Sequence, residues 1–172
     1  HLILIRLVNH MNITFKMLAM LALSFSFNIT QAQETPKEED FFKIMKVRVP
    51  EGPVLEVGGL ITLPNGNLGI STRRGDVFIV ENPTSNRPYF RKFATGLHEI
   101  LGIAYKDGAI YVAQRGELTK LVDKNMDGKA DVYETIYAWP LSGHYHEYSF
   151  GPKIAPDGSF FITANVAFGS QE

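Results

Sequence analysis

One pattern occurs three times in this 172-residue chain and limits what it can fold into. Each copy has a short apolar segment, an Asn-Gly or Asp-Gly pair that ends at Gly66, Gly108 or Gly158, and a second apolar segment. These pairs allow the positive φ angles of a tight turn, so each copy is predicted to be a β-hairpin. The glycines lie 42 and then 50 residues apart, a period that is typical of β-propeller blades.

The first two copies continue in the same way. An Arg-Gly pair, Arg74-Gly75 or Arg115-Gly116, follows the second segment and starts a third apolar segment. A fourth strand is expected at residues 89–94 in the first copy and at 133–139 in the second. The pattern predicts an all-β fold, because strand-forming segments are separated by turn signals at short spacing. A β-sandwich is the structural alternative.

The propeller interpretation also sets an expected number of blades. Residues 41–172 leave room for about three blades, whereas closed propellers have four to eight. We therefore expect the N-terminal portion of a longer β-propeller domain, a partial ring whose remaining blades lie beyond residue 172.

The segment before the repeats has the features of a secretory signal. Residues 1–10 precede the first methionine, Met11, and are interpreted as upstream translation. Residues 11–32 combine a basic start, an apolar run of about eleven residues and a small-residue cleavage site, which predicts a signal peptide. Residues 33–40 form a polar linker. A buried core helix and an uncut membrane anchor are the alternatives to the signal.

Export to the periplasm or the extracellular space follows from this signal, with no membrane span left after cleavage. The sequence has no cysteine, so neither disulfides nor thiolate metal sites contribute. Seventeen basic and eighteen acidic residues give no electrostatic reason to expect nucleic acid as a partner. Nothing in the sequence sets the oligomeric state.

An aspartate-rich segment between the second and third copies follows the calcium-loop pattern D-x-[DN]-x-[DN]-G-x5-E. Side chains at alternate positions direct oxygen atoms at one centre, and Gly128 permits the sharp turn. Strand-forming residues flank the loop, so it is interpreted as an insertion between strands. A plain surface turn is the alternative. The predicted Ca²⁺ ligands are Asp123, Asn125, Asp127, the backbone carbonyl of Lys129, Asp131 and Glu134.

A histidine-containing segment precedes the third copy. His144 and His146 are two residues apart and would point to the same side of an extended chain, with Glu147 next to them. Such a group could bind a metal or supply a general base. Two surface histidines on a loop are the alternative. Arg73 and Arg74 form either a solvated pair or an anion site.

Three blocks, residues 58–80, 96–113 and 146–163, resemble the soluble glucose/sorbosone dehydrogenases, six-bladed β-propellers that use pyrroloquinoline quinone (PQQ). The blocks read GGLITLPNGNLGISTRRGDVFIV, GLHEILGIAYKDGAIYVA and HEYSFGPKIAPDGSFFIT. The resemblance implies about three of six blades and oxidation of a sugar or another alcohol. It also implies that His146 is the base that takes the hydroxyl proton while hydride passes to the quinone, with His144 or Glu147 as helpers.

Three functions remain open from the sequence. The first is the PQQ-dependent dehydrogenase. The second is a non-enzymatic propeller that binds glycans or proteins, either alone or as part of a larger haem-containing protein. The residues Glu147-Tyr148-Ser149 favour it, since they stand where the family has paired glycines. The third is a calcium-dependent propeller hydrolase such as a lactonase.

Overall fold

The structure is a computed structural model that describes residues 35–52, 54–140 and 147–164. Ten strands in three antiparallel sheets make up nearly all of its regular secondary structure, so the predicted all-β fold is confirmed at that level. Residues 1–44 and 45–172 separate into two units, and all three sheets belong to the second. In the first unit, one helical turn, α2 (Glu38–Phe41), lies partly within the predicted linker.

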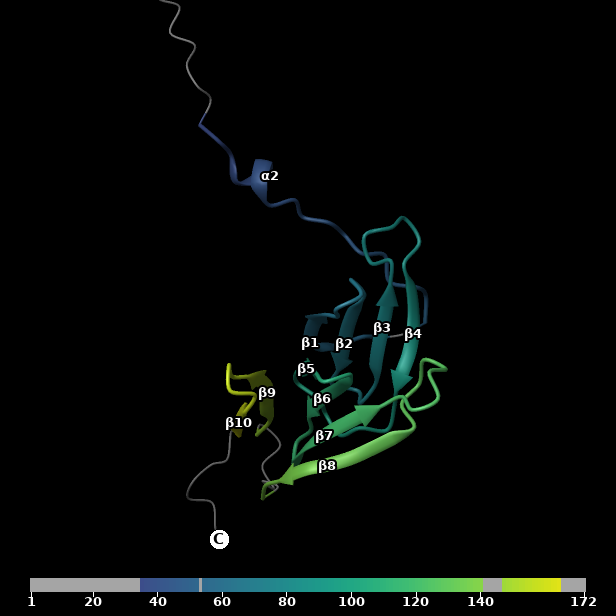
Figure 1. Cartoon of the computed structure of the whole chain (residues 1–172). Coiled ribbons are helices and arrows are strands. Elements are labelled where there is room, and N and C mark those ends of the chain that lie inside the picture. Colours follow the sequence, from purple (N-terminus) through teal and green to yellow (C-terminus); the bar gives the residue numbers. More distant parts are fainter. Residues whose placement is uncertain (1–34, 53, 141–146, 165–172) are drawn as a thin grey trace, which may run out of the picture. The chain divides into compact units, whose positions relative to one another are not determined.

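Each sheet contains strands that are consecutive in the chain (Figure 1). The first sheet has the order β1 (Val57–Thr62), β2 (Leu68–Thr72), β3 (Val77–Glu81) and β4 (Tyr89–Ala94). The second has the order β5 (Ile103–Lys106), β6 (Ala109–Ala113), β7 (Glu117–Val122) and β8 (Val132–Ala138). The third pairs β9 (Ser149–Ile154) with β10 (Phe160–Ala164).

The predicted hairpins are all present. Strand β4 has the predicted bounds, and β8 lies one residue earlier than expected. The first strand, however, begins at Val57, although the propeller portion was expected to begin at residue 41. The predicted signal peptide and upstream residues lie outside the described residues. In the described part of the chain, no helix is both long and apolar enough to span a membrane.

The turn glycines adopt the backbone that the sequence predicts. Gly66, Gly108 and Gly158 have φ angles of 82°, 81° and 85°. In the first and third turns, the glycine N–H donates to the carbonyl three residues earlier, at 2.9 Å in both. In the second turn, Asp107 is also left-handed, at φ 50°. Residues with positive φ at both centres of a two-residue loop twist the chain as adjacent strands require.

The first strands of successive sheets lie against one another through glycines. A Cβ on Gly59 would lie 2.7 Å from the Cα of Gly102, and a Cβ on Gly102 would overlap the carbonyl oxygen of Gly151. An isolated parallel bridge between Leu101 and Phe150 joins the second and third sheets at the same place. These glycines occupy corresponding positions in the three copies, because side chains there would keep the backbones apart.

The core lies between sheets. On β3, Val77 and Ile79 face the cluster that the first sheet shares with the second, while Phe78 and Val80 face the other side of the first sheet. On β6, Ile110 faces that shared cluster, and Tyr111 faces a cluster that includes the third sheet. Central strands that are covered on both faces read as continuous apolar runs, as β3 and β6 do.

Candidate functional site

Turns and loops from the three sheets meet at one end of the structure. The segment before β1 contacts the β2–β3 turn, since the Arg73 N–H donates to the Glu56 carbonyl at 2.9 Å. The β4–β5 loop contacts the β6–β7 turn, since the Arg115 N–H donates to the His98 carbonyl at 3.1 Å. The Trp139 indole also donates to the Arg115 carbonyl, at 2.9 Å. These contacts hold together the turns and loops that carry the charged side chains of this end.

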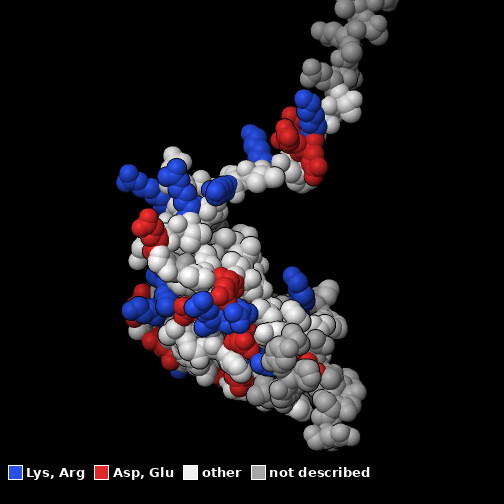
Figure 2. Space-filling view, turned by 180° about the vertical axis from the view of Figure 1, so that it is seen from behind, with Lys and Arg blue, Asp and Glu red and all other residues white. Residues whose placement is uncertain are grey.

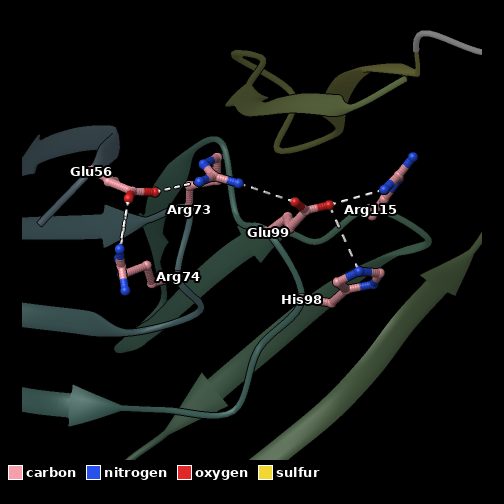
Figure 3. Close-up of polar contacts among 6 residues, drawn as sticks. All are labelled: Glu56, Arg73, Arg74, His98, Glu99 and Arg115. Atoms are coloured by element: carbon pink, nitrogen blue, oxygen red, sulfur yellow. Dashed lines mark hydrogen bonds and ion pairs between the residues drawn. The ribbon is translucent and has the colours of Figure 1, made fainter. Parts of the chain in front are cut away.

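Glu56 lies between two arginines of the β2–β3 turn (Figure 3). Its Oε2 is 2.7 Å from Arg73 Nη2, and its Oε1 is 3.0 Å from Arg74 Nη2. Partial burial raises the pKa of Glu56, but Arg74 and Arg73 lower it by more, so the pKa lies below its usual value of 4.5. The charge of Glu56 in turn raises the pKa of Arg73.

Glu99, in the β4–β5 loop, extends this set of contacts from the first sheet to the second. Its Oε1 is 3.4 Å from Arg73 Nη1, and its Oε2 is 3.0 Å from Arg115 Nη1 and 3.7 Å from His98 Nε2 (Figure 3). The arginine–glutamate network is defined here as Glu56, Arg73, Arg74, His98, Glu99 and Arg115. It runs without a break from Arg74 to Arg115.

The two glutamates of this network occupy the same place in successive copies of the repeat. Glu56 and Glu99 each lie three residues before an inter-sheet glycine, Gly59 and Gly102. Both have positive φ angles, 34° and 46°, which are unfavourable for a residue with a side chain. Backbone strain of this kind persists only where surrounding contacts enforce it, and it is concentrated at functional sites.

The third copy differs at this position, where Tyr148 lies three residues before Gly151. The guanidinium carbon of Arg115 is 5.4 Å from the centroid of the Tyr148 ring, a cation–π distance. The preceding residue, Glu147, is only 8% exposed. The third sheet thus contributes an aromatic ring and a buried glutamate where the other two contribute a strained glutamate.

Of the predicted catalytic residues, Glu147 is described, and it lies next to the network. His144 and His146 lie outside the described residues. Arg73 and Arg74 are neither a solvated pair nor an open anion site, because Glu56 binds both. Glu56, Glu99 and Arg115 were not predicted as site residues from the sequence, although an alignment of the copies on their inter-sheet glycines places the two glutamates in register.

The aspartate-rich loop lies between β7 and β8 and is folded by its own side chains. The Gly128 N–H donates to Asp123 Oδ2 at 2.8 Å, and the Asp127 N–H donates to Asn125 Oδ1 at 2.9 Å. The Lys124 N–H donates to Asp131 Oδ2 at 2.8 Å, while Asn125 Nδ2 is 3.3 Å from Asp131 Oδ1. Hydrogen bonds within the loop therefore bring Asn125 and Asp131 together without the help of an ion.

The fit of the loop to Ca²⁺ is partial. Asp123 Oδ1 is buried without a hydrogen-bond partner in the structure, as a ligating oxygen would be. Glu134, in contrast, lies on β8 with its Oε2 3.5 Å from Lys120 Nζ. The Lys129 N–H donates to Asp127 Oδ1. The backbone carbonyl of Lys129 stays a predicted ligand. No group of three or more His, Asp or Glu side chains arranged for a metal occurs among the described residues.

Comparison with known proteins does not assign this chain to a family. No family model, no curated protein and no solved structure matches it. The two ends of the sheets carry the candidate sites: the arginine–glutamate network lies at one end and the aspartate-rich loop at the other.

Proposed function

We propose that the three sheets are successive blades of a β-propeller. The glycine contacts between β1, β5 and β9 support this proposal, since the innermost strands of neighbouring blades must approach closely around a common axis. The two-sided burial of β6, between clusters shared with the first and the third sheet, supports it as well, because each blade packs between two others. Phe161 is 66% exposed on β10, next in sequence to Phe160, which packs against the second sheet. A further blade would cover that exposed face.

The proposed activity is oxidation of a sugar or another alcohol with PQQ at the end that carries the arginine–glutamate network. One observation carries this proposal: the chain enters β9 at the network, with Glu147 buried and Tyr148 against Arg115. His146, which the resemblance marks as the base, precedes Glu147 in the sequence and lies outside the described residues. Loops that enter the first strand of a blade are suitable for ligands, because a rigid sheet holds them.

The side chains of this end suit the proposed ligands. PQQ would supply the hydride acceptor, and its carboxylates would share Arg73 and Arg74 with Glu56; the side chains of these two arginines are 48% and 58% exposed. Paired arginines and glutamates also present donors and acceptors together, as the hydroxyl groups of a sugar require. His146 would take the hydroxyl proton, and Glu147 would orient its imidazole.

A non-enzymatic propeller that binds a glycan is the second candidate. The Tyr148 ring beside Arg115 favours it, since an aromatic ring can stack on a sugar without any chemistry. Under this proposal the end binds its ligand without PQQ.

One experiment separates the two. The full-length protein is incubated with Ca²⁺ and PQQ, and dye-linked oxidation of a panel of aldoses and alcohols is measured for the wild type and for His146→Ala. The dehydrogenase predicts turnover that is lost in the variant. Sugar binding by calorimetry that persists in His146→Ala, with no turnover in either protein, would support the binding module and contradict the dehydrogenase.

We also propose that the aspartate-rich loop binds Ca²⁺, with Asp123, Asn125, Asp127 and Asp131 as its side-chain ligands. The buried Oδ1 of Asp123 supports this proposal. Titration of chelator-treated protein with CaCl₂ by calorimetry should show one site per chain, and Asp131→Ala should lose it. Retention of that site in Asp131→Ala would contradict the proposal.

A further inference from the structure

Trp139 and Ser149 meet at the end of the structure that carries the arginine–glutamate network, although they are ten residues apart in sequence. The indole Nε1 of Trp139 lies 2.9 Å from Ser149 Oγ and 2.9 Å from the carbonyl oxygen of Arg115. The Ser149 hydroxyl donates to the same carbonyl oxygen, at 3.1 Å. Three polar atoms, from the residue after β8, the start of β9 and the β6–β7 turn, therefore form a closed triangle of hydrogen bonds.

The core between the second and third sheets shields this triangle from water. Trp139 packs against the same core cluster as Phe160 and Ile162 of β10, and Ser149 is only 3% exposed. A hydrogen bond is stronger where water is excluded, and a buried polar group that loses its partner costs the free energy of desolvation. The triangle therefore fixes the three segments to one another at this point.

Arg115 connects the triangle to the network. Its backbone N–H donates to the His98 carbonyl at 3.1 Å, so both polar groups of its backbone are bonded. Its guanidinium group pairs with Glu99 at 3.0 Å (Figure 3) and lies 5.4 Å from the centroid of the Tyr148 ring. Tyr148 immediately precedes Ser149 in the chain. The triangle therefore restrains both the backbone that carries the ring and the backbone that carries the guanidinium group.

We propose that Trp139 and Ser149 are positioning residues for ligand recognition at this end, because they set the place of the Tyr148 ring relative to the Arg115 guanidinium group. This inference rests on the proposed function, in which a sugar or another alcohol binds here. Groups that recognise a ligand must be held to within about 0.5 Å by the residues behind them. Tyr148 and Arg115 belong to different copies of the repeat, so the triangle supplies a restraint that neither copy has alone.

The test compares wild type, Ser149→Ala and Trp139→Phe as full-length proteins. Calorimetry without PQQ measures the Kd of glucose, galactose, xylose and glycerol, and the dye-linked assay with PQQ measures KM and kcat for the same compounds. For the compound that the wild type binds most tightly, each variant should raise the Kd and the KM about fivefold, as loss of one hydrogen bond would. The kcat should stay within about twofold of the wild type. The double variant should be no worse than the weaker-binding single variant, since both donors act on one carbonyl.

Ser159→Ala is the matched control. Ser159 lies in the β9–β10 turn, at the other end of the same hairpin, where its hydroxyl donates to Asp157 Oδ1 at 2.6 Å. This variant should bind the compounds as the wild type does, and thermal melts establish that every variant is folded. A purely structural role would lower kcat or the number of binding sites and leave the Kd and the KM unchanged, which would overturn the inference alone.

A wild type that binds and oxidises none of the four compounds would overturn the proposed function, and this inference with it.

Discussion

The first two copies of the repeat and the third differ where each enters its first strand. Glu56 and Glu99 are strained, and each is held by arginines; Tyr148 stands at the corresponding place with an ordinary backbone and packs on Arg115. In a repeating scaffold, we expect a residue that is the same in two copies to stabilise the contact between those copies. A position that changes is free to serve something else. We therefore expect the segment that leads into β9, the first strand of the third copy, to recognise a ligand.

The contact that all three copies share should show the largest effect when it is broken. Gly102→Val places a branched side chain where the carbonyl oxygen of Gly151 lies, with a rigid backbone on the other side. We expect a loss of about 3 kcal/mol or more in the free energy of unfolding, measured by urea denaturation. Gly96→Ala is the control, because nothing lies within 4 Å of a Cβ there; strain at its φ of 78° should cost only about 1–2 kcal/mol. Equal losses would mean that the glycine contact does not hold the sheets together.

The position that differs should affect function rather than stability. Tyr148→Glu gives the third copy the residue of the first two, and Arg115 can pair with it. We expect the free energy of unfolding to stay within about 0.5 kcal/mol of the wild type, while the proposed sugar oxidation, measured by the dye-linked assay, falls about tenfold or more. Tyr148→Phe keeps the ring and should retain most of the activity. If the proposed activity is found, an unchanged kcat/KM in Tyr148→Glu would contradict a role in ligand recognition for the segment that leads into β9.

The carboxylate that joins two copies should have a moderate effect. Glu99 contacts Arg73 from the first sheet and Arg115 from the second, so Glu99→Gln leaves both arginines without their shared charge. We expect a loss of about 1–2 kcal/mol, measured by thermal melting at low and high salt. Glu134→Gln is the comparison, since it removes only the pair with Lys120 on the surface of β7 and β8 and should cost less than about 0.5 kcal/mol.

Acid should show the smallest effect, through Glu56. Its pKa is lowered in the folded chain, so its pairing stabilises the fold above its usual value of 4.5 and is lost as the pH falls from there through the lower folded value. Thermal melts between pH 6 and about pH 3 should therefore show a steeper acid decline for the wild type than for Glu56→Gln. Identical slopes would mean that Glu56 contributes nothing to the acid dependence.

The strands could be predicted from sequence because local signals determine them. Asn65-Gly66, Asp107-Gly108 and Asp157-Gly158 specify the turns, and the apolar residues on either side specify the strands. The helical turn at Glu38–Phe41 was missed: the Lys37 N–H donates to Asp40 across a single turn, within a segment interpreted only by its polarity.

The network was harder to predict because its contacts join residues that are distant in sequence. Arg73 meets Glu99 across 26 positions only because the second sheet packs against the first. Arg73 and Arg74 alone gave no sign of Glu56, 17 residues earlier, as their partner. On the face shown in Figure 2, acidic and basic side chains lie next to one another.

The column formed by Gly59, Gly102 and Gly151 has a consequence for how such a chain can lengthen or shorten. Each sheet presents the same small residue to the sheet before it and to the sheet after it. A duplicated unit of about 46 residues, the distance from the start of β1 to that of β5 and from β5 to β9, would therefore meet a matching surface on both sides. After gain or loss of one whole unit, neighbouring sheets would still meet through the same glycine contacts. Recombination between copies would therefore preserve the packing while it changed the residues that precede the first strand of each sheet.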